Sequence, residues 1–130
     1  MDKTTRISRT ELAILNCLWD SDGATIRELT DQVYPDGTPT NYATVQKLLD
    51  RLEEKGVVRR DRSSRAHRFR AIVSQEQYIG GRLQALADSV CGGSFTPLLT
   101  QLVRGKRLKK GDLDELQALL GKLSSRRKKP

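Results

Sequence analysis

The stretch from Thr38 to Gly56, TPTNYATVQKLLDRLEEKG, constrains the fold more than any other part of the chain. Its apolar residues fall at i, i+3, i+4 and i+7, the spacing of a helix with one buried side. These residues are Val45, Leu48, Leu49 and Leu52. Thr40 is a candidate N-cap, because its hydroxyl can accept a hydrogen bond from an N–H of the first turn. Gly56 follows the last periodic residue and is the candidate stop.

The outward face of this helix is polar at its beginning and acidic at its end. Small, amide-bearing and cationic side chains face outward in the first turns, whereas Asp50, Glu53 and Glu54 occupy the last ones, where they would repel phosphate. This polarity suits a helix that enters the DNA major groove by its N-terminal end. An ordinary solvated helix is the alternative. The candidate DNA contacts are Asn41, Tyr42, Ala43, Thr44, Gln46, Lys47 and Arg51.

Two shorter helices are predicted before this stretch. Ser8–Glu11 and Thr25–Glu28 each have the pattern of a capping box, and the helices that they open should end near Asp20 and Val33. A turn rich in Pro and Gly then leads into the third helix. Three helices, the second short and joined by a turn to the third, form the helix-turn-helix plan. The inward residues expected of the first two are Leu12, Leu15, Leu18, Trp19, Ile26, Leu29 and Val33.

After Gly56 the apolar residues no longer have the spacing of a helix. VVRRDR and HRFRAIV are short runs separated by residues 63–66, which predicts a β-hairpin. Between Val57 and Ile72 there are six arginines and one acidic residue, so the hairpin indicates the wing of a winged helix, whose arginines can reach phosphates or a narrow minor groove. The alternative is an edge hairpin charged to prevent strand pairing. The candidate DNA contacts here are Arg60, Arg62, Arg65, His67 and Arg68.

Three more helices are predicted after the hairpin. Ser74 opens a fourth helix that ends at Gly92–Gly93, and Ser94 is the candidate cap of a short fifth one. Asp112 opens the last helix after the basic linker 104–111. The apolar residues form narrow heptad seams, which a second copy of the chain would cover. The candidate dimerisation residues are Ile79, Leu83, Leu86, Leu98, Leu102, Leu113, Leu116, Leu120 and Leu123.

The predicted fold class is therefore mainly α with a small β-hairpin wing: a winged helix-turn-helix followed by a helical dimerisation region. The expected organisation is a DNA-binding domain over residues 1–73, a dimerisation region over 74–125 and a disordered basic tail over 126–130.

A net charge of +8 and a pI near 9.9 indicate an anionic partner, with nucleic acid ahead of a membrane surface. No apolar run has the length of a membrane span, and the N-terminus lacks the core of a signal peptide, so we expect a cytoplasmic protein without membrane insertion. Cys17 is expected in the core, whereas a redox role of Cys91 stays open. One histidine and two distant cysteines predict no metal and no cofactor. Without a nucleophile or carboxylate constellation around His67, no enzyme is expected.

Three segments resemble the penicillinase-repressor family, the BlaI, MecI and CopY type: TELAILNCLW (10–19), NYATVQKLLDRLEEKGVVRR (41–60) and RAHRFRAIVSQEQY (65–78). The resemblance implies a dimeric bacterial repressor on palindromic operators of resistance or stress genes. It also implies induction by a membrane-bound metalloprotease receptor, with cleavage in the dimerisation region between Asn and Phe. The positional match here is Gln101–Leu102, which keeps neither residue. The copper-responsive branch has a C-terminal CxC motif, which is absent after Cys91.

Two other functions stay open from the sequence. A winged helix can serve as a protein-contact module, with its basic wing meeting an acidic partner. A repressor of this plan can also respond to a small ligand bound at the dimer interface.

Overall fold

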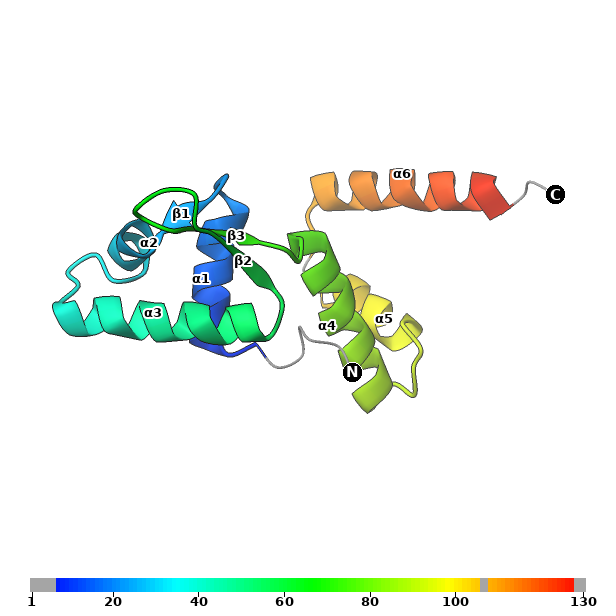
Figure 1. Ribbon diagram of the computed structural model, residues 1–130. Coiled ribbons are helices and arrows are strands. Elements are labelled where there is room, and N and C mark those ends of the chain that lie inside the picture. The colour runs from blue at the N-terminus through cyan, green and yellow to red at the C-terminus, as the bar shows by residue number, and fades with distance from the viewer. Residues whose placement is uncertain (1–6, 106–107, 128–130) are drawn as a thin grey trace. The chain divides into compact units, whose positions relative to one another are not determined.

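The fold is known from a computed structural model that describes residues 7–105 and 108–127. The contacts within the chain divide it into two compact units, residues 1–85 and 86–130 (Figure 1). The elements in chain order are α1 (Arg9–Trp19), β1 (Ala24–Thr25), α2 (Ile26–Val33), α3 (Pro39–Glu54), β2 (Val58–Asp61), β3 (Arg68–Ala71), α4 (Gln75–Val90), α5 (Thr96–Arg104) and α6 (Lys110–Arg127). The expected class, mainly helical with a small wing, is confirmed.

The capping boxes begin the helices as predicted. The Ser8 hydroxyl accepts the Glu11 N–H at 3.1 Å, and the Glu11 carboxylate accepts the Ser8 N–H at 2.8 Å. Thr25 and Glu28 repeat this exchange at 3.1 and 2.9 Å. Each exchange satisfies two N–H groups that the first helical turn leaves without backbone partners.

The third helix begins earlier than predicted. Its N-cap is Thr38 and not Thr40, because Pro39 has the fixed backbone angle that suits the first helical position. The Thr38 N–H donates to the Asn41 side chain at 2.9 Å. Gly56 follows the helix with a φ of +76°, a conformation that favours glycine, so the predicted stop is confirmed.

The core of the first unit lies between these helices and an antiparallel sheet with strand order β1-β3-β2. Phe69 of β3 is fully buried and pairs with Ala24 on one side and Arg60 on the other. The strand β1 was not predicted, because two residues are too few to show an alternating pattern. The inner face of α1 also differs from the prediction. Ile14, which was not among the predicted inward residues, is fully buried, whereas Leu12, which was, is only half-buried. The buried set is Ile14, Leu15, Leu18, Ala24, Leu29, Val45, Leu48, Leu49, Leu52, Val57, Val58 and Phe69.

The first turns of α4 belong to the first unit. The Trp19 indole donates to the Val73 carbonyl at 2.9 Å, and its ring lies 5.6 Å from the ring of Tyr78. These contacts join the start of α4 to the first unit, which runs to Ala85. Cys17 packs partly buried against the core, as expected, and burial raises the pKa of its thiol.

The second unit contains the end of α4 with α5 and α6. Gly92 and Gly93 end α4 with φ of +56° and +88°, as predicted. The N-cap of α5 is Phe95 and not Ser94, although the Ser94 hydroxyl accepts the Thr96 N–H at 3.3 Å. The helix α6 begins two residues before Asp112.

The structure describes only part of the predicted basic linker, 104–111, and of the predicted basic tail, 126–130. Residues 106–107 of the basic linker and 128–130 of the basic tail lie outside the described residues. The helix α6 runs to Arg127 and so includes residues 126 and 127, the first two of the expected tail.

Candidate nucleic-acid interface

The N-terminal half of α3 presents a polar face. Tyr42, Ala43, Gln46 and Lys47 are exposed, whereas Val45 is buried between them. Each of the four therefore projects from the outer side of the helix. Long side chains such as Gln46 and Lys47 can reach base edges from that position.

Two other predicted contacts on α3 already have partners within the helix. The half-buried Thr44 donates its hydroxyl hydrogen to the Thr40 carbonyl at 3.0 Å. The Asn41 side chain accepts the N–H of Thr38 and so caps the helix. Asn41 and Thr44 therefore shape the first turns, while Arg51 is exposed farther along α3.

Arg60 of β2 forms ion pairs with two acidic residues of α3. An Arg60 guanidinium nitrogen lies 2.8 Å from Asp50 and 3.2 Å from Glu53. The same guanidinium lies 4.8 Å from the centre of the Phe69 ring, and the Arg60 side chain is 16% exposed. Arg60 thus joins β2 to α3, and its expected contact with DNA stays a prediction.

The loop between β2 and β3 forms the wing tip, residues 62–67. Arg62 and Arg65 are exposed there, and His67 is half-buried. The backbone hydrogen bond from Ser63 lowers the pKa of Asp61, whose carboxylate accepts that N–H at 2.9 Å and holds the turn. The structure therefore presents both tip arginines on a shaped loop.

Arg68 lies at the other end of the wing and is tied to the body of the unit. Its guanidinium donates to the Gly23 carbonyl at 3.0 Å and lies 3.5 Å from the Glu28 carboxylate. Arg68 was expected near the tip, but it occupies the start of β3, paired with Thr25 of β1.

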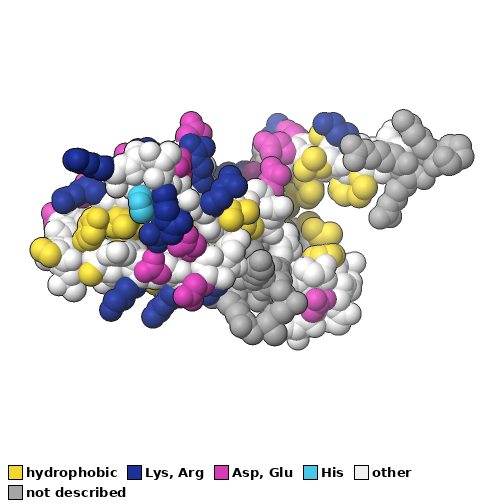
Figure 2. All heavy atoms as spheres, in the orientation of Figure 1, with side chains coloured by type: hydrophobic (Ala, Val, Ile, Leu, Met, Phe, Trp, Pro, Cys, Tyr) yellow, Lys and Arg dark blue, Asp and Glu magenta, His cyan; other side chains and the backbone are white. Residues whose placement is uncertain are grey.

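The wing tip, α2 and α3 surround a shared region of the surface. Figure 1 shows the loop between β2 and β3 extending toward α2. A hollow of about 340 Å³ is lined there by residues of α2, α3 and the tip, among them Arg27, Gln46 and His67. Figure 2 shows basic side chains over this face, with acidic ones beside them.

Arg27 was missed by the sequence analysis. It is exposed on the first turn of α2, and its guanidinium lies 5.9 Å from the centre of the Tyr42 ring. The short motif TIRELT gave one signal, since the helix-turn-helix plan places the second helix next to the third. Nothing in the sequence indicated the contact with Tyr42.

Comparison with known proteins identifies the family. A model of the penicillinase repressor family matches residues 7–122. The chain belongs to this family. Members are transcriptional repressors and not enzymes as a class, so the protein is a DNA-binding transcriptional repressor.

Two curated relatives align with nearly the whole chain. The transcriptional regulator BlaI of Mycobacterium tuberculosis, in strains CDC 1551 and H37Rv, is 28% identical over 127 residues, which cover 96% of this chain and 90% of the relative. An uncharacterised 16.5 kDa protein of Latilactobacillus sakei is 24% identical over 119 residues, covering 92% of this chain and 81% of that protein. Within residues 7–105 and 108–127, no helix is long and apolar enough to cross a membrane.

The predicted dimerisation residues of this repressor lie on α4, α5 and α6. Leu98 and Leu116 are half-buried. The others are exposed in the single chain by 41 to 54% of their surface: Ile79, Leu83, Leu86, Leu102, Leu113, Leu120 and Leu123. The candidate cleavage pair, Gln101–Leu102, lies within α5, and both of its residues are exposed.

Proposed function

We propose that this protein is a dimeric bacterial repressor that binds a palindromic operator with α3 and the wing. The observation that carries the proposal is the position of the exposed side chains of Tyr42 and Gln46. They lie beside the cationic wing tip, around one hollow. Such a surface can follow a duplex, with the helix in the major groove and the wing on the adjacent backbone.

The residues of the proposed DNA interface differ in their chemical roles. Gln46 and Lys47 face outward in the early turns of α3 and recognise base edges, since amide and ammonium groups match donors and acceptors of the major groove. Arg62 and Arg65 bind phosphates or enter the minor groove. Arg60 contributes indirectly, because it holds the wing against α3 and offsets the charge of Asp50 and Glu53.

A second copy of the chain covers the leucines of α4, α5 and α6. Monomeric proteins rarely expose so many large apolar side chains over consecutive helices. A two-fold dimer places two α3 helices on two half-sites, which explains a palindromic operator. Residues 74–125 remain the proposed dimerisation region and residues 1–73 the proposed DNA-binding domain.

Cleavage at Gln101–Leu102 would release the operator by separating α6 from the dimer. The helix α5 has no buried residue, so its local unfolding to admit a protease costs little. The partner would be a membrane metalloprotease receptor system, as the family implies, and the repressor itself would act in the cytoplasm.

The proposal is tested with duplexes from the regions flanking the gene, searched for inverted repeats. Fluorescence anisotropy should show binding at least about 10³-fold tighter to one palindrome than to a scrambled duplex of equal length. Only base recognition distinguishes two duplexes of equal charge. Equal affinity for all of them would favour the protein-contact alternative, and a change in affinity with a metabolite would favour a ligand-responsive repressor.

A further inference from the structure

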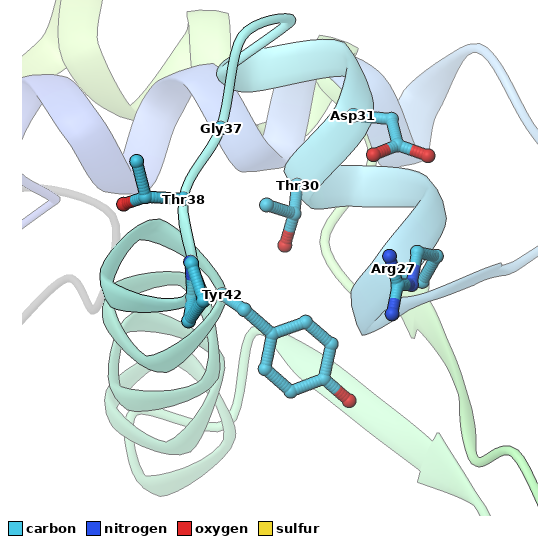
Figure 3. Close-up of a pocket in the computed structure, with 7 residues that line it drawn as sticks. Arg27, Thr30, Asp31, Gly37, Thr38 and Tyr42 are labelled. Atoms are coloured by element: carbon cyan, nitrogen blue, oxygen red, sulfur yellow. The ribbon is translucent and has the colours of Figure 1, made fainter.

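Arg27 and Tyr42 separate two hollows on the surface of the first unit, and each hollow is lined by both residues. The first hollow, of about 350 Å³, lies between α2 and the start of α3. Figure 3 shows the Tyr42 ring projecting from α3 toward α2, from which Arg27, Thr30 and Asp31 project. The second hollow is the one bordered by the wing tip.

The charges of the two hollows differ. Asp31 lines the first hollow, so a phosphate there would meet a carboxylate as well as Arg27. The second is lined by Arg27, Arg60, Arg65 and His67, and none of the described residues that line it has a carboxylate. Arg60 is engaged by Asp50 and Glu53, which leaves the other three side chains for a ligand. The second hollow therefore suits an anion, and the first does not.

The cations of the second hollow come from different elements. Arg27 belongs to α2, while Arg65 and His67 belong to the wing tip, so they converge from two sides. The Tyr42 ring lies 5.9 Å from the Arg27 guanidinium, a cation–π distance that orders this long side chain. Among the described residues, the ion pairs include neither Arg27 nor Arg65. Both guanidinium groups can therefore bind a phosphate without first breaking an ion pair.

We infer that the second hollow binds a phosphate of the duplex DNA backbone, and that Arg27 of α2 holds it together with Arg65 and His67. This inference rests on the proposed function and adds α2 to the interface. A duplex that meets α3 in one groove and the wing in the next must pass a strand of its backbone between them. The second hollow lies at that position, and guanidinium and imidazole N–H groups are suitable donors to a phosphodiester.

A phosphate contact is independent of base sequence, so the test needs no operator. The probe is a fluorescein-labelled, mixed-sequence duplex of about 30 base pairs, titrated at several KCl concentrations. Two substitutions, Arg27→Ala and Arg27→Gln, remove the charge from an exposed position where the fold should persist. Each should weaken binding about three- to tenfold and flatten the slope of log affinity against log salt by about 0.9, the loss of one phosphate contact.

Arg9→Ala is the matched control. Arg9 is also exposed and its loss changes the net charge equally, but it lies in the first turn of α1. That turn contacts the opposite end of α3, where Glu11 meets Lys55 at 2.8 Å. Arg9→Ala should keep the slope of the unaltered protein. If both Arg27 variants also keep it while the parent binds DNA, the inference is overturned and the proposed function stands.

Two further outcomes separate the remaining possibilities. A parent protein that binds no duplex overturns both the inference and the proposed function. The second outcome comes from a measurement of the melting temperature with and without inorganic phosphate, at matched ionic strength. If phosphate raises the melting temperature of the parent but not of Arg27→Ala, and duplex affinity is the same for both, the hollow binds a free phosphate and the backbone assignment is wrong.

Discussion

Arg60 of β2 and Asp50 of α3 are joined by an ion pair of 2.8 Å. The pair connects the two elements that the proposed interface needs in a fixed relation. It is supported by the Phe69 ring, which lies 4.8 Å from the same guanidinium, and by Glu53 at 3.2 Å. Arg60 is thus a positioning residue with three partners in the first unit.

Arg60→Ala should reduce the free energy of unfolding by about 1–2 kcal/mol, because it removes a cation–π contact and an ion pair in which the Arg60 side chain is 16% exposed and the Asp50 side chain 52%. It should also weaken DNA binding by loosening the wing. Arg62→Ala is the control, since Arg62 is exposed at the tip. That variant should keep the stability of the parent and flatten the salt slope by about 0.9. Urea denaturation and anisotropy on the same samples check both; unchanged stability of Arg60→Ala would contradict the positioning role.

The predictions that succeeded depend on residues close in sequence. Ser8 and Glu11 lie three residues apart, and so do Thr25 and Glu28, so the sequence alone indicates where α1 and α2 begin. The buried stripe from Val45 to Leu52 was predicted for the same reason, because helical periodicity is a local property.

The features that were missed depend on distant partners. Arg68 bonds to Gly23, and Arg60 to Asp50 across the turn between α3 and β2. The sequence shows the charges of both arginines but not these partners, so it could not predict that the two side chains also connect parts of the first unit. The Arg27–Tyr42 contact is of the same kind, since it joins α2 to α3 through tertiary packing.

A second prediction concerns base recognition by Gln46. Gln46→Ala should weaken binding to the operator palindrome by about 1–3 kcal/mol and leave the affinity for mixed-sequence DNA nearly unchanged. Gln32→Ala, which shortens an exposed glutamine on α2, should have no effect on either duplex. Anisotropy with both duplexes provides the comparison. Equal losses on the two duplexes would show that Gln46 does not touch a base edge.

The third prediction concerns the pH dependence of stability through Glu11. Burial raises the pKa of Glu11, but hydrogen bonds from Lys55 and Ser8 outweigh it, so the pKa lies below its ordinary value. The Glu11 side chain is 3% exposed and lies 2.8 Å from the Lys55 ammonium. Because the pKa of Glu11 is lower in the folded state than in the unfolded state, its charge contributes fully to stability above the unfolded pKa of about 4.3. This contribution disappears as the pH falls through the folded pKa.

Glu11→Gln should therefore cost about 1–3 kcal/mol of unfolding free energy near neutral pH, where a buried charge-assisted hydrogen bond is lost. The difference from the parent should shrink at acidic pH, because the parent then loses the same charge. Urea denaturation of both proteins at equal concentration, from about pH 7 to pH 3, measures it. A difference that stays constant over this range would show that the Glu11 charge does not stabilise the fold.

The last prediction links dimerisation to operator binding. Leu120 lies on the proposed seam of α6 and is 54% exposed in the single chain, so Leu120→Asp should leave the folded chain intact. In a dimer the new carboxylate would be buried without a partner, at a cost of several kcal/mol, which should shift the protein to monomer. Ala118→Asp adds the same charge at an exposed position on the opposite side of the heptad and should remain dimeric.

Sedimentation gives the oligomeric state of each variant, and anisotropy gives its affinity for DNA. The Leu120→Asp monomer should lose the tight binding to the palindrome and keep the weak binding to mixed-sequence DNA, because one α3 and one wing remain. A Leu120→Asp protein that stays dimeric would remove α6 from the interface, and a monomer that binds the palindrome as tightly as the parent would disprove the need for two copies.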